Sequence, residues 1–363
     1  MKINKSHLIQ QDNATNEQVR ALAAVSLNEY NYGLLPAWPS ETGSFEVSII
    51  VDKQKSMRVI VFCCKALTPG GIKIDIEEKG QGQEFFINLQ NWLAGLKDQE
   101  KKSFYLSLSA DLFNRVPTGD ILQSEDPPRF PYAVPNLSLN LIAEEDLAKN
   151  HVSMDSVIIG KVILGREEIE VAKKYIPACT SLKSHHDLIA YHTRVEQFLG
   201  RLELFSLDII KKVREKKQDS ILASSVLRLC LRMIDYMGPL ALKVKWEHKN
   251  MAPIYSFESL ASLARIMNND IQSNTSMDME ELINYFTLWS ELKQGDFEKL
   301  LSYCTNFNYD HNEIGESVDQ FDEFMTIIES LFNKLSELAF IGKKKETNIF
   351  VKEHKTKRSF LAD

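Results

Sequence analysis

Three histidines come closer to a metal site than any other group of residues in the sequence. His185, His186 and His192 lie near the start of a helical segment. His185 and His192 are two helical turns apart and share one face, and imidazole is a common zinc ligand. However, Ile189 lies between them, no HExxH pattern is present, and Asp187 is expected to point away. A metal-assisted hydrolase stays open as an alternative, but we predict no metal and no other cofactor.

Other patterns that support catalysis are missing from the sequence. It contains no GxSxG, no P-loop, no GxGxxG after a strand and no recognisable Cys-His spacing. Glu144, Glu145 and Asp146 form an acidic run at a strand end, which is typical of a solvated loop. The five cysteines include no CxxC pair, so we expect reduced and mostly buried thiols. The prediction is a protein without enzymatic activity.

Composition narrows the class of protein further. The chain has 363 residues, 44% of them hydrophobic, which is enough for two or three packed cores. A net charge of −7 argues against a general nucleic-acid binder, because such a protein carries a basic face. No stretch approaches the ~20 apolar residues that a membrane helix needs. We expect a soluble cytoplasmic protein.

The hydrophobic pattern before Pro177 has the period of β-strands. Alternating patterns occupy 72–76, 104–108 and 137–141, and continuous apolar runs occupy 45–51 and 57–64, with Gly/Pro-rich turns between them. Short helices are expected at about 14–28 and 88–97. We predict an α+β, multidomain protein that begins with an antiparallel β-sandwich.

After Pro177 the period becomes helical. Helices are expected from His185, at 219–243, from a cap at Ser256, from 277 to a break at Gly295-Asp296, and at the end of the helical part. Heptad-like stripes run along the first and last of these helices. Their predicted packing residues are Leu188, Val195, Phe198, Leu202, Phe321, Ile328 and Phe332. Such stripes serve either the core of one bundle or a seam between chains, and here they exceed what a small bundle is expected to bury.

These patterns suggest three parts. We expect a β-sandwich domain over 1–176, a helical bundle over 177–342 and a basic tail over 343–363. The tail is expected to be solvated and mobile in the isolated protein, and to order against an acidic, partly apolar groove of a partner. Its predicted contact residues are Lys343, Lys344, Lys345 and Phe350.

Five segments, in order along the chain, resemble the TssK family of type VI secretion baseplate proteins. They are "HLIQQD" (7–12), "LNEYNYGLL" (27–35), "KALTPGGIKIDI" (65–76), "RVPTGDILQSEDPPRFPYAVPNLSLNL" (115–141) and "YIPACTSLKSHHDLIAYHTRVEQFLGRL" (175–202). The resemblance that they mark extends over most of residues 6–210. The third resembles the family's strand-turn-strand, and the fourth resembles a segment of its Bacteroidetes branch. The last resembles a hinge that leads into a helix.

This resemblance implies a non-enzymatic structural adaptor. Family members connect a wedge of TssF and TssG to a membrane-anchored complex, on the cytoplasmic side of the inner membrane. The resemblance implies a shoulder-like sandwich, a helical neck and a homotrimer. It also implies that the N-terminal region faces the wedge, so we expect Leu8, Ile9, Gln10, Gln11 and Asp12 to dock there in a strand-like manner.

The sequence departs from the family pattern at both ends. The family's longer opening is reduced to "MKINK" (1–5), and the C-terminal head that grips the membrane complex is not expected after Gly342. The membrane-side partner is therefore open. The main alternative is a phage-tail-like trimeric receptor-binding protein, whose sandwich would carry a distal ligand site.

Overall fold

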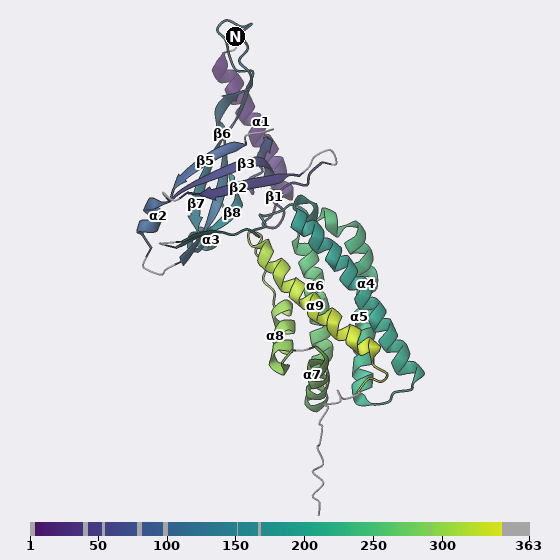
Figure 1. Ribbon diagram of the computed structural model, residues 1–363. Coiled ribbons are helices and arrows are strands. Elements are labelled where there is room, and N and C mark those ends of the chain that lie inside the picture. The colour runs from purple at the N-terminus through teal and green to yellow at the C-terminus, as the bar shows by residue number, and fades with distance from the viewer. Residues whose placement is uncertain are drawn as a thin grey trace, which may run out of the picture.

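The computed structural model describes residues 4–38, 43–52, 55–77, 82–96, 101–150, 152–165, 168–290 and 292–342. It is a mixed fold with antiparallel sheets in the first half and long helices in the second (Figure 1). The predicted change from strands to helices near Pro177 is confirmed, since the last strand ends at Val171 and the first long helix begins at His186. In the described ranges, no helix is long and apolar enough to cross a bilayer.

The first sheet is built around one long strand, β3 (Ser56–Leu67). β2 (Phe45–Val51) and β1 (Gly33–Leu34) pair along one side of it, and β4 (Lys73–Glu77) and β5 (Gln83–Asn88) along the other. Three of these strands, β2, β3 and β4, carry the predicted patterns. β1 and β5 were not predicted.

The second sheet has the order β7-β6-β8-β9, with bounds Tyr132–Ala143, Lys101–Thr118, Ser156–Gly165 and Ile169–Val171. The sequence prediction missed β8, which is apolar and buried almost throughout and therefore lacks a period of two. Gly160 of β8 places the sheets in contact: a Cβ there would lie 3.0 Å from Ile49 of β2. Buried side chains of both sheets join one apolar cluster that continues into the helices.

The far ends of β6 and β7 leave the second sheet as a two-stranded ribbon. β8 pairs with β6 only between Lys101 and Ser109, whereas β7 follows β6 as far as Thr118. Such a ribbon has little stability alone, because each strand has one partner and no second layer. Two short helices connect strands: α2 (Gln90–Ala94) lies between β5 and β6, and α3 (Glu144–Asn150) lies between β7 and β8.

The helical half contains six long helices in the described residues. They are α4 (His186–Glu215), α5 (Ile221–Trp246), α6 (Ile254–Gln272), α7 (Ser276–Ser290), α8 (Gln294–Thr305) and α9 (Ile314–Glu337). The expected break at Gly295-Asp296 is wrong by a few residues, because both lie in the first turn of α8, where an acidic side chain suits the positive end of the helix. Ser256 is not a cap; it lies inside α6.

The seven predicted packing residues all lie in the interior of this bundle. Leu188, Val195, Phe198, Leu202, Phe321, Ile328 and Phe332 are each at most 1% exposed. Phe321 stacks on Phe257 with ring centroids 5.7 Å apart and meets Phe307 edge-on at 5.0 Å. The expectation that the stripes exceed what one bundle buries is therefore wrong, since the chain covers them with its own helices.

Truncation of the central aromatic side chain tests this packing. We expect Phe321→Ala to lower the free energy of unfolding by about 3–5 kcal/mol, because a buried ring is lost and a cavity stays behind. The matched control is Tyr303→Ala on exposed α8 surface, which should change it by less than about 0.5 kcal/mol. Denaturant unfolding measures both. Equal effects would contradict the assignment of Phe321 to the core.

Candidate functional surfaces

The chain opens with a long helix, α1 (Lys5–Ser26). Asn4 caps it: its side chain accepts the N–H of His7 at 3.2 Å, and Nδ1 of His7 accepts the N–H of Asn4 at 3.3 Å. The strand-like conformation expected for Leu8 to Asp12 is therefore wrong, because these five residues lie in the first turns of a capped helix. The sequence prediction began this helix at about residue 14 and missed a capping box that uses histidine in place of glutamate.

None of the described side chains of α1 is buried. The helix is held near its C-terminal end by Arg20, whose guanidinium donates to the carbonyl of Gly70 at 3.0 Å and to Asp155 at 3.1 Å. Leu8, Ile9, Gln10, Gln11 and Asp12 are all exposed, and so are Val19, Leu22 and Val25 further along. Isolated helices are marginal in water, so a helix with so little packing is unusual.

The β6–β7 ribbon lies beside this helix, and both project away from the bundle (Figure 1). The Arg115 guanidinium of the ribbon contacts Asp12 of α1 at 2.9 Å. The ribbon and its turn expose large apolar side chains, namely Phe113, Val116, Ile121, Phe130, Tyr132 and Val134. Together they form with α1 a protruding apolar surface, which we call the arm. Sequence reasoning missed the ribbon residues, although alternating aromatic and aliphatic residues beside prolines were a signal for them.

A polar junction joins the sheets to the bundle just ahead of α9. Glu313 forms an ion pair with Lys161 of β8 and accepts the hydroxyl of Tyr105 of β6. Lys161 also contacts Glu144 at 3.0 Å. Burial opposes the charge of Lys161, but hydrogen bonds to Glu313 and Glu144 raise its pKa overall. Burial and the bond to Glu313 also raise the pKa of Tyr105, so its hydroxyl remains a donor.

Two further contacts complete the junction. The Tyr32 hydroxyl donates to the Asn312 side chain at 3.0 Å, and the Tyr175 hydroxyl donates to the Asn312 carbonyl at 2.8 Å. Nε2 of His311 lies 2.9 Å from the Tyr32 carbonyl, and Nδ1 lies 2.7 Å from the Tyr309 hydroxyl. A carbonyl only accepts, so Nε2 carries the proton and Nδ1 accepts from tyrosine. Burial lowers the pKa of His311 to about 4, which keeps the ring neutral.

A hollow of about 540 Å³ lies against this junction, between the end of the second sheet and helices α4 and α9. Its walls carry both signs of charge, with Lys161, Lys173 and Arg194 facing Glu313 and Asp322. Arg194 is bound to Asp322, since its Nε lies 3.0 Å from that carboxylate. The ion pairs Lys161–Glu313 and Arg194–Asp322 use these charges to hold the structure together. We therefore assign the hollow to the contact between sheets and helices and not to a ligand site.

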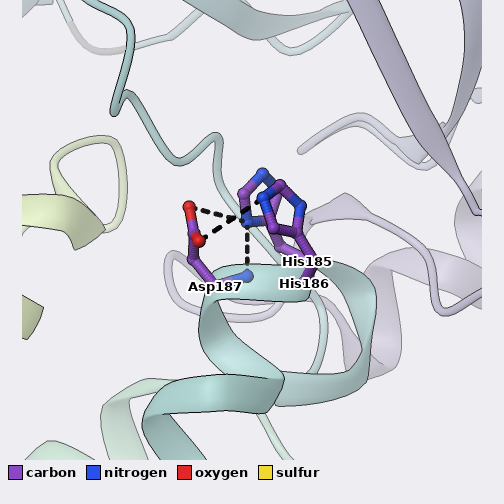
Figure 2. Close-up of side chains that lie close together, drawn as sticks. All are labelled: His185, His186 and Asp187. Carbon is purple, nitrogen blue, oxygen red and sulfur yellow. Dashed lines mark hydrogen bonds and ion pairs between the residues drawn. The ribbon is translucent and has the colours of Figure 1, made fainter.

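His185, His186 and Asp187 are brought together at the start of α4, as Figure 2 shows. The expectation that Asp187 points away is wrong: its carboxylate lies 3.4 Å from Nε2 of His186 and 3.8 Å from Nδ1 of His185. His192 is not part of this group of potential ligands; its Nε2 lies 3.9 Å from Glu196. Burial, together with the neighbouring His186, lowers the pKa of His185 to about 4.

The geometry of this cluster favours capping over metal binding. The centroids of the two imidazole rings lie 4.3 Å apart, with the ring planes tilted by 31°. The group offers three ligand atoms within 4.8 Å of one another, one fewer than the four of a structural zinc site. In addition, Nδ1 of His185 already accepts the N–H of Asp187, and the helix N-terminus is positive. We assign His185 to the N-cap of α4 and Asp187 to its acidic first turn.

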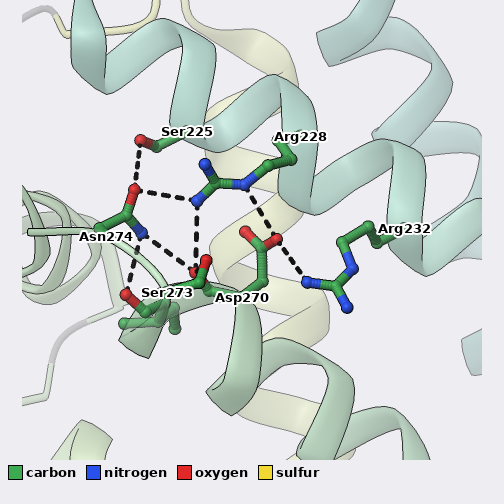
Figure 3. Close-up of polar contacts among 7 residues, drawn as sticks. Ser225, Arg228, Arg232, Asp270, Ser273 and Asn274 are labelled. Atoms are coloured by element: carbon green, nitrogen blue, oxygen red, sulfur yellow. Dashed lines mark hydrogen bonds and ion pairs between the residues drawn. The ribbon is translucent and has the colours of Figure 1, made fainter.

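Asp270 is the one fully buried carboxylate among the described residues, and it holds α6 to α5 (Figure 3). One of its oxygens lies 3.1 Å from the guanidinium groups of both Arg228 and Arg232. Asn274 extends the network to Ser225 at 2.9 Å and to Arg228 at 2.9 Å. Because both arginines lie on α5 and their partners lie on or just after α6, the network is a clamp between two helices.

The cysteines show no reactive environment. All five are free, and Cys64, Cys179, Cys230 and Cys304 are buried while Cys63 is half-buried. Burial raises the pKa of Cys64, Cys230 and Cys304 to about 12, so these thiols stay protonated near neutral pH. The prediction of reduced, mostly buried thiols is confirmed. The predicted contact residues Lys343, Lys344, Lys345 and Phe350 lie outside the described residues.

Comparisons with protein-family models and with curated proteins found no match. Solved structures do match. TssK from the EAEC type VI secretion system (T6SS), in complex with a nanobody, is 14% identical over 91% of this chain and 99% of that chain, with a TM-score of 0.47. A crystal structure of TssK is 12% identical over 92% of this chain and 67% of that chain, with a TM-score of 0.48.

A third match is a chain of the TssK-TssF-TssG baseplate subcomplex of the type VI secretion system, seen by cryo-electron microscopy. It is 13% identical over 93% of this chain and 97% of that chain, with a TM-score of 0.41. The chain is thus similar to TssK structures at low sequence identity. The function proposed below rests on the chain's own segments and surfaces.

The neutral, buried state of His311 predicts how stability depends on pH. Its pKa in the folded state, about 4, lies below the usual value of 6.5, so the unfolded chain binds more protons between these values. The stability contribution is full above about pH 6.5 and is lost as the pH falls toward 4. We expect His311→Gln to reduce the slope of unfolding free energy in this window by up to about 1.4 kcal/mol per pH unit.

Denaturant unfolding at a series of pH values measures this slope. The matched control is His7→Gln at the half-exposed start of α1, where a glutamine can accept the N–H of Asn4 in place of the imidazole. An unchanged slope in His311→Gln would show that folding does not lower the pKa of His311.

Proposed function

We propose that this protein is a structural subunit of the baseplate of a type VI secretion or related contractile injection apparatus. In this proposal it links a wedge of TssF- and TssG-like proteins to a membrane-side complex on the cytoplasmic face of the inner membrane. The parts are a sandwich-like platform (1–176), a helical bundle (177–342) and a basic segment (343–363). It acts by binding and carries out no reaction.

The arm is the observation that carries this proposal. Its helix begins with the same "HLIQQD" segment that resembles the opening of TssK, and none of its described side chains is buried. Burial of apolar surface contributes roughly 25 cal/mol per Å², so a partner that covers Leu8, Leu22 and the ribbon aromatics gains substantial free energy. A surface that exposes several aromatic and aliphatic side chains together is typical of a protein interface.

The segment predicted to dock has a geometry suited to a groove. Leu8, Gln11, Thr15, Gln18, Leu22 and Val25 recur at steps of three and four, so they share one face of α1. That face carries no charged side chain. Docking of the helix in a groove of the wedge therefore replaces the strand-like docking expected from the sequence.

Assembly as a homotrimer is a further part of the proposal. The predicted stripe of α4 is covered by the bundle, but the opposite face of the same helix exposes Ile189, Leu204 and Leu207. Gly200 lies on this face with open space where a Cβ would stand. A glycine inside an exposed helix is destabilising by about 1 kcal/mol relative to alanine, and close approach of another helix would account for it.

Removal of the first turns of α1 tests wedge binding. We expect deletion of residues 1–12 to abolish co-purification of wedge proteins from the native cell, because the exposed helix start and the Asp12 contact with Arg115 are lost. The fold should survive, since none of the described residues in this stretch is buried. Tyr303→Ala, on exposed α8, is the control. Wild-type recovery of the wedge by the truncated protein would refute the role of the arm.

Light scattering of the purified protein tests the trimer. We expect a mass of about three chains at micromolar concentration, and its reduction by Leu204→Lys combined with Leu207→Lys, because charges in an apolar contact are costly. The matched control, Leu288→Lys on α7, should leave the mass unchanged. A wild-type monomer at every accessible concentration would count against the proposed assembly.

A further inference from the structure

A small apolar hollow lies at the far end of the bundle, between α6, α7 and α8. Its volume is about 280 Å³, several times the ~30 Å³ share of one water. Ile271, Ile283, Phe297 and Leu301 form its floor, with Met279 at the edge. Asn268, Gln272, Glu298 and Ser302 complete the lining. An apolar floor with a polar rim suits a single apolar side chain of a peptide.

The surface around this hollow is acidic. Glu280 and Glu281 lie on the exposed side of α7, and Glu298 stands at the rim on α8. Within the described part of the chain, none of these three carboxylates forms an ion pair. The sequence predicted an acidic, partly apolar groove as the target of the basic segment and placed it on a partner protein; a groove of this chemistry is present on the chain's own bundle.

The described chain ends next to this surface. The N–H of Gly342 donates to the Tyr285 hydroxyl of α7 at 3.0 Å, so the described chain ends beside this helix. Tyr285 and Ile283 are two positions apart, which places them about 200° apart around α7. A segment that leaves Tyr285 must therefore cross the exposed side of α7, where Glu280 and Glu281 lie, to reach the hollow.

The length and charge of the following residues fit this path. Half the circumference of a helix about 10–12 Å across is about 17 Å. The eight residues from Lys343 to Phe350 extend to about 26 Å, which is sufficient. Residues 343–363 hold seven basic and three acidic side chains, with Lys343, Lys344 and Lys345 at the start of the path and Phe350 at its end.

We propose that residues 343–352 dock on their own bundle, with the three lysines along Glu280 and Glu281 of α7 and Phe350 in the hollow between α6, α7 and α8. Burial of the Phe350 ring offsets the conformational entropy that the segment loses when it becomes ordered. Attraction between the lysines and the two glutamates favours this path over others. Any partner that binds Phe350 then has to displace it from this hollow. The inference does not depend on the baseplate proposal.

Limited trypsin digestion of the full chain tests this docking. Docked residues resist cleavage, because the protease needs the segment released. We expect cleavage after Lys352 to be about tenfold slower in the wild type than in Phe350→Ala or in the double variant Glu280→Lys/Glu281→Lys. The control Asp208→Lys/Glu215→Lys makes the same charge change on exposed α4 and should behave as wild type. Equal rates in wild type and Phe350→Ala overturn the proposal.

A binding measurement gives an independent result. A synthetic peptide of residues 343–363 should bind saturably to protein that lacks these residues, more weakly at high salt, and less to the Glu280→Lys/Glu281→Lys form than to the α4 control. No binding, or equal binding to both, refutes the docking surface.

The protection from trypsin should also be the same from about 1 to about 100 µM protein, since the contact lies within one chain. Protection that grows with concentration assigns the segment to a neighbouring copy and overturns the intramolecular contact.

Discussion

The ion pair between Lys161 of β8 and Glu313, just ahead of α9, is the contact on which the joining of sheets and helices depends. Both side chains are only 14% exposed. Charges that have lost their water need a partner, so each of these groups stabilises the structure only while the other is in place. Tyr105 and Glu144 complete the hydrogen bonds of the pair, and Tyr32, Tyr175 and His311 hold the neighbouring Asn312 segment. A single loop thereby fixes the start of α9 against β6 and β8 of the second sheet and against the segment just ahead of β1.

This well-packed joint contrasts with the arm. The bundle buries its apolar stripes completely, whereas α1 and the β6–β7 ribbon expose theirs. A structural protein needs both properties, because a rigid body transmits position and an uncovered surface binds the next component. The clamp of Asp270 between Arg228 and Arg232 contributes to the rigidity of the bundle. It fixes α6 to α5 at the level where the chain turns toward α7.

The far end of the bundle combines two features that are separated in sequence by some sixty residues. α7 carries Glu280 and Glu281 without a cationic partner in the described structure, and the basic residues begin beside it after Gly342. Opposite charges held at short range by a tether have a high effective concentration, so even a weak contact is populated. A binding segment kept on its own bundle in this way is released only to a partner that binds it better.

Local patterns in the sequence predict the change from strands to helices and the residues of the bundle interior. The alternation at 72–76 follows from the period of a strand. The spacing of three and four residues, which begins at Leu188 on α4 and ends at Phe332 on α9, follows from the period of a helix. Such patterns occur wherever one face of a strand or helix is buried. The sequence also showed that the acidic run at Glu144 and the histidines near α4 match no catalytic motif. It missed β8, since a strand covered on both faces has no period, and it misread Leu8–Asp12, since an exposed helix has no apolar stripe to reveal it. Three features follow from the packing of the whole chain: Asp187 turns back to the histidines, Glu313 contacts Lys161 across 152 residues, and the chain's own helices cover the apolar stripe of α9. Contacts between distant segments depend on how the sheets and helices pack, and no local pattern encodes that.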